Sequence, residues 1–333
     1  MRSVGPVRII GPVLDDELFI PLATYESPLW PSVERGARVT AAAGGIRTVI
    51  HDDRMTRSVL FEAPDAEIAS AAIHEIRTRM ADLAAVAEAG SRYTKFLDMH
   101  DQVVGNLLFL RLEMHTGDAS GHNMVTAGAD RVVQWVLDTF PSLQYVSVSG
   151  NYCSDKKPTA VNAILGRGKS VIAETLIPEK LCSRFLKTTP HSVAELNTKK
   201  NLIGTMIAGG IRTANAHYAN ILLGFYLATG QDAANIVEGS QGITYAAVRD
   251  GALYFSCTIP NIIVGTVGAG KNLPFVSENL ERLGCTVDRP AGDNARRLAA
   301  ICGAAILCGE LSLLAALTNQ GELMEAHTRL ERG

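Results

Sequence analysis

The sequence lacks several patterns that would place it in a common functional class. Its six cysteines include no C-x-x-C pair and no histidine-rich partner spacing. A zinc site is therefore not expected, and the thiols fit a reducing, cytoplasmic environment. Basic and acidic residues balance at 31 and 34, which argues against nucleic-acid or anionic-membrane binding. The first residues lack the continuous apolar stretch of a signal peptide.

Only one apolar run approaches the length of a membrane span. It covers residues 298–317 and carries Glu310 inside it. A helix that is apolar all round can equally form the centre of a large soluble fold, and we favour that interpretation. Apolar residues make up 47% of the 333-residue chain, enough for a sizeable core and for two domains.

The interval between Arg57 and Ser149 has the pattern of a small domain. A strand is expected at 58–62, then a helix capped by Asp65 and stopped near Gly90. Strands are expected at 93–99 and 108–115, the second half-buried because its apolar residues alternate. A helix at 121–140 and a strand at 143–148 complete the order β-α-β-β-α-β, which is ferredoxin-like. We therefore predict an α+β fold in which 58–148 is inserted into a larger domain of 1–57 and 149–333.

The segment Ser149-Gly-Asn-Tyr-Cys-Ser-Asp-Lys-Lys-Pro158 places one carboxylate beside two ammonium groups. Lysines rarely crowd an acid and each other near apolar residues unless an anion or a developing oxyanion binds there. A polar surface turn is the alternative, and for a Lys-Lys pair alone it is the commoner case. We interpret the segment as an active-site loop. Cys153 has no histidine beside it in sequence, so we expect it to pack.

Two glycine-rich segments approach the phosphate-binding P-loop pattern without completing it. Gly265-Thr-Val-Gly-Ala-Gly-Lys-Asn272 has Asn272 where the hydroxyl that binds Mg²⁺ belongs. Gly166-Arg-Gly-Lys-Ser170 has Ala163 where the first glycine belongs. A phosphoryl-transfer enzyme is therefore a weak alternative. No G-x-G-x-x-G occurs, so a nicotinamide cofactor would not use a Rossmann fingerprint.

Two short segments suit a phosphorylated ligand. Gly117-Asp-Ala-Ser-Gly-His-Asn-Met124 opens the second helix of the small domain, and small residues at a helix N-terminus suit a pyrophosphate. An ordinary capped helix start is the commoner explanation. Ser91-Arg92 lies in the turn before a strand and offers a guanidinium for a further phosphate.

Two carboxylates stand in secluded settings. Glu26 lies in an uncharged, mostly apolar stretch, where burial would keep it protonated near neutrality as a general acid must be; a carboxylate that caps the following turn is the simpler explanation. Asp232 follows a long apolar helix at 216–228. His217, on that helix, is more often a satisfied core histidine than a catalyst, and His327 stands in a polar segment where a surface histidine is the default.

Taken together, these segments resemble 3-hydroxy-3-methylglutaryl-coenzyme A (HMG-CoA) reductase over essentially the whole chain, in the class I-like branch shared with eukaryotic and archaeal enzymes and in the short soluble form of some bacteria. The matching segments stand in the family's order: 21–26, 55–57, 117–124, 149–158, 166–170, 200–202, 215–217, 230–234, 265–268 and 309–313. The resemblance implies a large substrate domain around a central helix, here 298–317, with an inserted ferredoxin-like domain that binds NADP(H). It also implies a homodimer, or a dimer of dimers, with active sites between subunits.

The implied reaction is a four-electron reduction of HMG-CoA to mevalonate and free CoA by two NADPH, without a metal. By the match, Lys156 holds the alkoxide formed from the thioester carbonyl. His327 protonates the departing CoA thiolate, and Glu26 gives a proton to the oxygen of the enclosed aldehyde. Asp232 would hydrogen-bond with both Glu26 and Lys156, and such coupled groups titrate together.

The resemblance also implies binding residues. Positions for the hydroxymethylglutaryl part of the substrate match Arg57, Ser149, Asp155, Lys157, Lys200 and Asn220. Positions on the CoA side match Ser32, Arg35, Arg38 and Lys187. The NADP(H) site matches Ser91, Arg92, Asp118, Ala119, Ser120, Gly121, His122 and Asn123, with Gly265 and Gly268 as sites of close backbone approach. Two departures stand out: the family's Thr-Thr-Glu-Gly reads Thr24-Tyr25-Glu26-Ser27, and His122 replaces an apolar side chain beside the cofactor.

Overall fold

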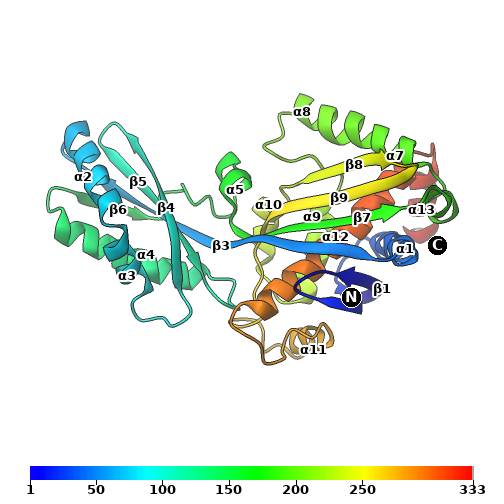
Figure 1. Ribbon diagram of the computed structural model, residues 1–333, viewed down its shortest axis with the longest axis horizontal. Helices are drawn as coiled ribbons and strands as arrows, with labels where there is room; N and C mark the ends of the chain where they lie inside the picture. Colours follow the sequence, from blue (N-terminus) through cyan, green and yellow to red (C-terminus); the bar gives the residue numbers. More distant parts are fainter. Residues whose placement is uncertain (332–333) are drawn as a thin grey trace.

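Two lobes share one long strand, β3 (Ile46–Glu62), which runs from one lobe into the other (Figure 1). The computed structural model describes residues 1–331, and for residues 326, 327 and 329–331 it describes the backbone only. The strand expected at 58–62 is only the end of this 17-residue strand. The boundary expected at 57/58 therefore lies inside a continuous strand, where local sequence gives no break.

The large lobe is built on a mixed sheet with the strand order β2-β1-β3-β7-β9-β8. Only β1 and β3 run parallel, and the other neighbours are antiparallel. Its strands besides β3 are β1 (Arg2–Ile10), β2 (Asp15–Leu22), β7 (Gly168–Ile177), β8 (Ile243–Arg249) and β9 (Ala252–Ile262). Its helices are α1 (Leu29–Ala42), α5 (Ala160–Leu165), α6 (Glu179–Leu181), α7 (Pro190–Leu196), α8 (Thr205–Ile207), α9 (Tyr218–Ala228), α10 (Ile236–Gly239), α11 (Pro274–Arg282), α12 (Asp293–Leu317) and α13 (Glu322–Glu331). Short π-helical or 3₁₀ turns complete it: η1 (Cys182–Leu186), η2 (Asn197–Gly204) and η3 (Ala233–Asn235).

Helix α12 is the core of the large lobe, as the sequence predicts. It is long and apolar enough to cross a bilayer, but 94% of its most apolar window is buried inside the fold. The carboxylate of Glu310 accepts hydrogen bonds from the backbone N–H groups of Ala216 and His217 and from the side chains of Asn201 and Thr244. A buried charge with this many donors is stable in a core. The burial expected for 298–317 is therefore confirmed.

The small lobe has the expected order of strands and helices. Its elements besides β3 are α2 (Ala66–Thr78), α3 (Met80–Glu88), β4 (Lys95–Val104), β5 (Leu107–His115), α4 (His122–Thr139) and β6 (Gln144–Val148). The strands form an antiparallel sheet in the order β4-β5-β3-β6. Asp65 caps α2 as predicted, accepting from the backbone N–H of Ile68 at 2.8 Å. The single helix expected up to Gly90 is wrong, because Arg79 leaves the helical conformation, packs over Trp135 and pairs with Asp82.

Strand β5 corrects a second expectation. Its alternating apolar residues predicted a half-buried strand, yet Arg111 and Glu113 on the other face are also fully buried. That face meets the large lobe, where Arg111 donates to the carbonyl of Gly166 at 2.6 Å and Arg54 pairs with Glu113. Charged residues are fully buried almost only when they pair with one another. The burial of Arg111 and Glu113 therefore depends on tertiary contacts, which the alternating pattern does not show.

A half-buried carboxylate, Asp53, joins β3 to three other elements. Its oxygens lie 3.0 Å from Lys169 Nζ on β7, 3.1 Å from Arg296 Nε on α12 and 3.3 Å from His115 Nε2 on β5. Burial alone raises the pKa of Asp53, but the charge of Lys169 and the contact with His115 outweigh it and hold the pKa below its usual range. Asp53 is therefore ionised at neutral pH and joins elements from both lobes.

We expect Asp53→Asn to lower the free energy of unfolding by about 3–5 kcal/mol at pH 7, because it leaves the buried ammonium of Lys169 without its partner. A carboxyl with a lowered folded pKa stabilises above its unfolded value of 3.8, and that contribution is lost as the pH falls toward the folded value. The difference from the wild type should therefore shrink below about pH 4. Urea titrations of the wild type and the variant, at pH 7 and below about pH 4, measure this difference in the free energy of unfolding. The exposed pair Glu195–Lys199 supplies the control, since Glu195→Gln should leave the midpoint unchanged.

Candidate active site

The predicted active-site loop, residues 149–158, connects β6 to α5 and has an unusual backbone. Asn151, Ser154 and Lys156 have φ values of 59°, 49° and 55°, in the left-handed region that side chains disfavour. Such residues persist only where surrounding contacts hold them, and they cluster at functional sites. The backbone N–H of Lys156 donates to Glu238 Oε1 at 3.1 Å. The loop is thus fixed in a conformation that its own residues do not favour.

Lys156 and Asp232 meet at the surface of this loop. Lys156 Nζ lies 2.9 Å from Asp232 Oδ2, and the two side chains are 42% and 44% exposed. The hydrogen bond that Lys156 donates to Asp232 raises the pKa of Lys156. Burial alone raises the pKa of Asp232, but the hydrogen bond with Lys156 outweighs it and lowers that pKa overall. The pair is therefore fully charged at neutral pH, and its exposure leaves the ammonium accessible to a ligand.

Asp155 presents one oxygen to the protein. Arg167 Nη2 donates to Asp155 Oδ1 at 2.7 Å, and His122 Nε2 and Asn235 Nδ2 lie 3.8 and 3.5 Å from the same atom. Burial alone raises the pKa of Asp155, but the charge of Arg167 and its hydrogen bond to Asp155 contribute in the opposite direction, and that pKa is lowered overall. Lys157 donates to the backbone carbonyl of Asp155 at 3.1 Å. These side-chain contacts all reach Oδ1, so Oδ2 can accept a hydrogen bond from a ligand hydroxyl.

Ser149 begins this loop, and Arg57 lies on the neighbouring strand β3, next to Ser58, whose carbonyl oxygen accepts from the N–H of Gly150 at 3.3 Å. Arg57 Nε is buried and has no hydrogen-bond partner among the described residues. A buried cationic donor without a partner points to an absent anion. Ser149 Oγ accepts from the N–H of Asn151 at 3.1 Å and lies 3.2 Å from Cys153 Sγ. Cys153 is fully buried, which agrees with the packing role expected for it.

Glu26 lines a separate cavity of about 490 Å³ in the large lobe. Asn220 Nδ2 donates to Glu26 Oε2 at 3.0 Å. His217 also lines the cavity, and its Nε2 lies 2.9 Å from the carbonyl oxygen of Gly309, so it is a satisfied histidine. The cavity brings together all the residues expected on the CoA side: Ser32, Arg35, Arg38 and Lys187. Arg35 is neutralised by Glu322 at 2.5 Å, whereas Arg38 and Lys187 are exposed cations.

Within one chain, Glu26 and Lys156 belong to separate sites. Helix α9 carries Asn220, the partner of Glu26, in its first turn and ends at Ala228, before Asp232. At 1.5 Å per residue, Asn220 and the last residue of this helix are about 12 Å apart along its axis. The expected hydrogen bond between Asp232 and Glu26 is therefore not formed within the described chain, although the bond between Asp232 and Lys156 is. Lys200, on η2, bonds Asn201 Oδ1 at 3.2 Å and joins neither group.

The segment expected to bind the cofactor begins α4. Gly121 is its N-cap, with φ of 96° and no capping side chain, so the first N–H groups of α4 are free for a phosphate. Arg92 is exposed, and its guanidinium lies over the ring of Tyr93. A Cβ on Gly117 would contact Tyr93 at 3.7 Å, so the segment that leads into α4 packs beside Tyr93, the residue after Arg92.

Several of the expected cofactor residues have structural partners of their own. The carboxylate of Asp118 accepts from the N–H groups of Gly292 and Ala295, which caps α12. Ser91 Oγ accepts from Thr94. A Cβ on Gly265 would fall 2.3 Å from Ser120 N, and Ala119 pairs with Val267. The lack of a side chain at Gly265 therefore lets the segment 265–267 pack closely against 119–120. A Cβ added at Gly268 would meet no atom within 4 Å.

His122, the residue that departs from the expected pattern, is the first residue of α4. Its Nδ1 lies 3.5 Å from Ser120 Oγ, and its Nε2 is buried without a hydrogen-bond partner among the described residues. Burial and the charge of Arg167 lower the pKa of His122, so the imidazole is neutral at pH 7. Asn123 follows it, exposed in the first turn of α4.

The lysines of the two P-loop-like segments hold protein groups in this structure. Lys271 Nζ donates to the carbonyls of Thr229 and Gly230 at the C-terminus of α9. Lys169 is buried against Asp53. The rival phosphoryl-transfer interpretation is therefore wrong.

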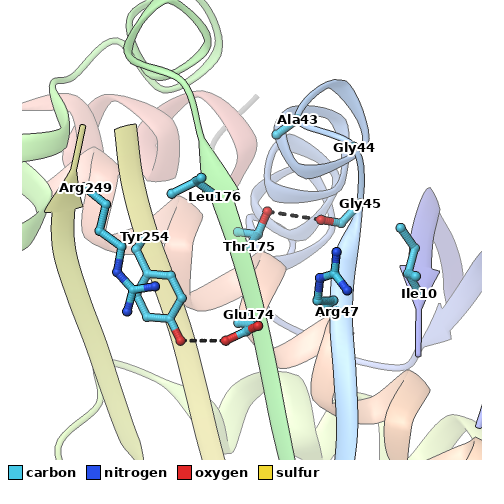
Figure 2. Close-up of a pocket in the computed structure, with 10 residues that line it drawn as sticks. All are labelled: Ile10, Ala43, Gly44, Gly45, Arg47, Glu174, Thr175, Leu176, Arg249 and Tyr254. Atoms are coloured by element: carbon cyan, nitrogen blue, oxygen red, sulfur yellow. Dashed lines mark hydrogen bonds between the residues drawn. The ribbon is translucent and has the colours of Figure 1, made fainter. Parts of the chain in front are cut away.

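A second cavity, of about 360 Å³, lies at the ends of β3, β7 and β9 and contains none of the expected site residues (Figure 2). Tyr254 donates to Glu174 at 2.6 Å, and Arg249 packs over the ring of Tyr254 (Figure 2). Thr175 donates to the carbonyl of Gly45 at 3.1 Å. The cavity is distinct from the candidate active site.

Sequence reasoning missed two residues that hold the loop in place, and one predicted catalytic residue has no described side chain. Arg167 and Glu238, both fully buried, hold Asp155 and Lys156. Arg167 was visible only as part of a glycine-rich motif, and the available signal for Glu238 was a single charge in the apolar stretch 236–239. His327 belongs to α13, but its side chain lies outside the described part of the structure.

The fold and these sites define a two-lobed enzyme that offers cations to an anionic substrate and an open helix N-terminus to a phosphate. The family model described as hydroxymethylglutaryl-coenzyme A reductase matches residues 3–332. The chain belongs to the HMG-CoA reductase family, which makes it an oxidoreductase and confirms the function expected from the sequence.

Its relatives and its structural neighbours agree with this family. The HMG-CoA reductase of Pyrococcus abyssi is 44% identical over all of this chain and 82% of its own length. That of Methanocaldococcus jannaschii is 43% identical over 98% of this chain and 81% of its own. A class II HMG-CoA reductase structure from Streptococcus pneumoniae, described as bound to NADPH, shares the fold with a TM-score of 0.76 at 20% identity, covering 96% of this chain and 76% of that chain.

Proposed function

We propose that this protein reduces HMG-CoA to mevalonate and free CoA with two NADPH, as a cytoplasmic, class I-like form of the family. The observation that carries the proposal is the exposed Lys156–Asp232 pair on a loop held in left-handed conformations. The class I-like assignment is supported by 43–44% identity to archaeal, fungal and plant reductases, against 20% to the class II structure.

Lys156 would hold the oxygen of the substrate carbonyl as it becomes an alkoxide, since its ammonium is accessible and its charge is fixed by Asp232. Glu26 would deliver a proton to the aldehyde oxygen in the second half of the reaction. His327 would protonate the CoA thiolate, and this role remains a prediction. NADPH supplies the hydride for each of the two reductions when it is bound.

The substrate would be recognised mainly through its charges. Arg57, with its unpartnered buried Nε, would bind the free carboxylate of the hydroxymethylglutaryl group, together with Lys157 and Lys200. Asp155 Oδ2 would accept its hydroxyl hydrogen. Ser149 and Asn220 would complete this part of the site. The exposed cations at the Glu26 cavity, Arg38 and Lys187, would neutralise the phosphates of CoA.

The residues of the small lobe fit NADPH. The uncapped N-terminus of α4 provides backbone donors for a pyrophosphate, and the exposed guanidinium of Arg92 provides a partner for the 2′-phosphate. His122 Nε2 is a buried polar atom that a ligand can satisfy. We assign residues 58–148 to a ferredoxin-like NADP(H)-binding domain and 1–57 with 149–333 to the HMG-CoA-binding domain.

The active protein would be a homodimer, or a dimer of dimers, with its sites between subunits. Glu26 and Lys156 must act on the same small group, yet the length of α9 separates them within one chain. A site made from Glu26 of one subunit and Lys156 of another removes that conflict. It also provides the contact between Asp232 and Glu26 that one chain lacks.

The proposed function is tested by mixing purified protein with HMG-CoA and NADPH and following absorbance at the NADPH band and release of free thiol. We expect two NADPH consumed for each CoA released. Replacing NADPH by NADH should lower kcat/KM, because the guanidinium of Arg92 then has no 2′-phosphate to bind. A folded protein that consumes no NADPH with this substrate would refute the proposal.

A further inference from the structure

The active-site loop rests on a buried ion pair that the reaction itself does not use. Arg167, at the start of β7, and Glu238, in α10, are both fully buried. Arg167 Nε lies 3.5 Å from Glu238 Oε1. A buried pair of this kind adds little stability over apolar residues, because desolvation offsets the attraction. Its position beneath the loop suggests another role.

Arg167 connects three parts of the site. Its Nη1 donates to Thr56 O at 2.6 Å and to Thr56 Oγ1 at 2.9 Å, on the strand that carries Arg57. Its Nη2 donates to Asp155 Oδ1 at 2.7 Å. The guanidinium thus fixes Asp155 relative to the strand of Arg57 through a rigid fork of donors.

Glu238 holds the loop at Lys156, the residue after Asp155. Its Oε1 accepts from the backbone N–H of Lys156 at 3.1 Å and from Asn235 Nδ2 at 3.0 Å. Lys156 is one of the left-handed residues of the loop, a conformation that costs about 1–3 kcal/mol where no contact compensates it. The backbone direction at Lys156 decides where its ammonium points. The hydrogen bond from Lys156 to Glu238 is therefore the contact that aims the side chain at Asp232.

We propose that Glu238 is a positioning residue for Lys156, acting through the backbone of the loop while Arg167 holds Asp155. This inference rests on the proposed reductase function. It requires that the length of the Glu238 side chain matter more than its charge, since the reach of Oε1 to the Lys156 N–H is what fixes the loop.

Two substitutions separate length from charge. Glu238→Gln keeps the length and an acceptor oxygen, so we expect kcat within about 3-fold of the wild type. Glu238→Asp keeps the charge beside Arg167 but withdraws the oxygen by one methylene. A displacement on that scale at a catalytic group lowers rates by about 100-fold, so we expect kcat to fall by about 10- to 100-fold. The KM for NADPH should stay within about 2-fold in both, since the start of α4 is untouched.

Asp16→Asn is the matched control, because it breaks the Arg297–Asp16 pair of 2.7 Å far from the loop. It shows how much kcat changes when an arginine–carboxylate pair is merely lost. The opposite order, with Glu238→Asp active and Glu238→Gln impaired, would overturn the proposal and assign the pair a purely electrostatic role. Equal activity of all variants would overturn it as well. An inactive wild type would instead refute the reductase function, so the two failures are distinguishable.

Discussion

Lys156→Ala is expected to lower kcat by about 100- to 1,000-fold, the loss measured when one donor to a developing oxyanion is removed. Lys156 is the accessible cation of the loop, and Asp232, at 2.9 Å, keeps it charged. Steady-state NADPH oxidation at saturating HMG-CoA measures the loss. Because the side chain is 42% exposed, the melting temperature should stay within about 2 °C.

Lys180→Ala is the control for this prediction, since Lys180 is an exposed lysine on α6. It should leave kcat unchanged, which shows that removing a surface lysine is not itself harmful. Activity of Lys156→Ala within 10-fold of the wild type would mean that another group holds the alkoxide.

Glu26→Gln is expected to lower kcat by about 100- to 10,000-fold, the range for loss of a general acid. The amide keeps the shape of the carboxyl group, and it can still accept the hydrogen bond from Asn220 but cannot release a proton. Supplying the aldehyde intermediate directly isolates the second reduction, where the full loss should be seen. An unchanged rate in that half-reaction would remove Glu26 from the proton step.

The same two variants test whether the site is shared between subunits. In a mixture of Glu26→Gln and Lys156→Ala chains, each mixed dimer would contain one intact site if Glu26 and Lys156 come from different subunits. Random mixing makes half of the dimers mixed, so we expect recovery of about a quarter of the wild-type activity. Recovery at the level of the separate variants would place both residues in one chain's site.

The elements with strong local signals were predictable from the sequence. Helix α4 and the apolar α12 follow from hydrophobic periodicity, and the cap at Asp65 follows from a side chain that bonds the backbone three residues away. The chemistry of the loop was also visible, because a carboxylate and two ammonium groups are adjacent in sequence. In each case the interacting groups are near neighbours along the chain.

Contacts between segments that are far apart in the sequence were not predictable in the same way. The carboxylate of Asp118 caps α12 by accepting from the N–H groups of Gly292 and Ala295, more than 170 residues away in sequence. Arg111 and Glu113, expected on an open strand face, are buried between the lobes. Each outcome depends on which surfaces pack together. The sequence does not show whether a charged side chain is solvated by water or paired with a buried partner.

The sequence by itself determined which chemical groups this protein has and the periodicity that forms its main helices. Only the tertiary structure decided that Glu310 is satisfied inside a buried helix, that Glu238 reaches the backbone of Lys156, and that Asn220, the partner of Glu26, lies about 12 Å along α9 from the end that precedes Asp232. The reason is physical: local propensities act over a few residues, whereas these contacts join residues brought together by packing of the whole chain.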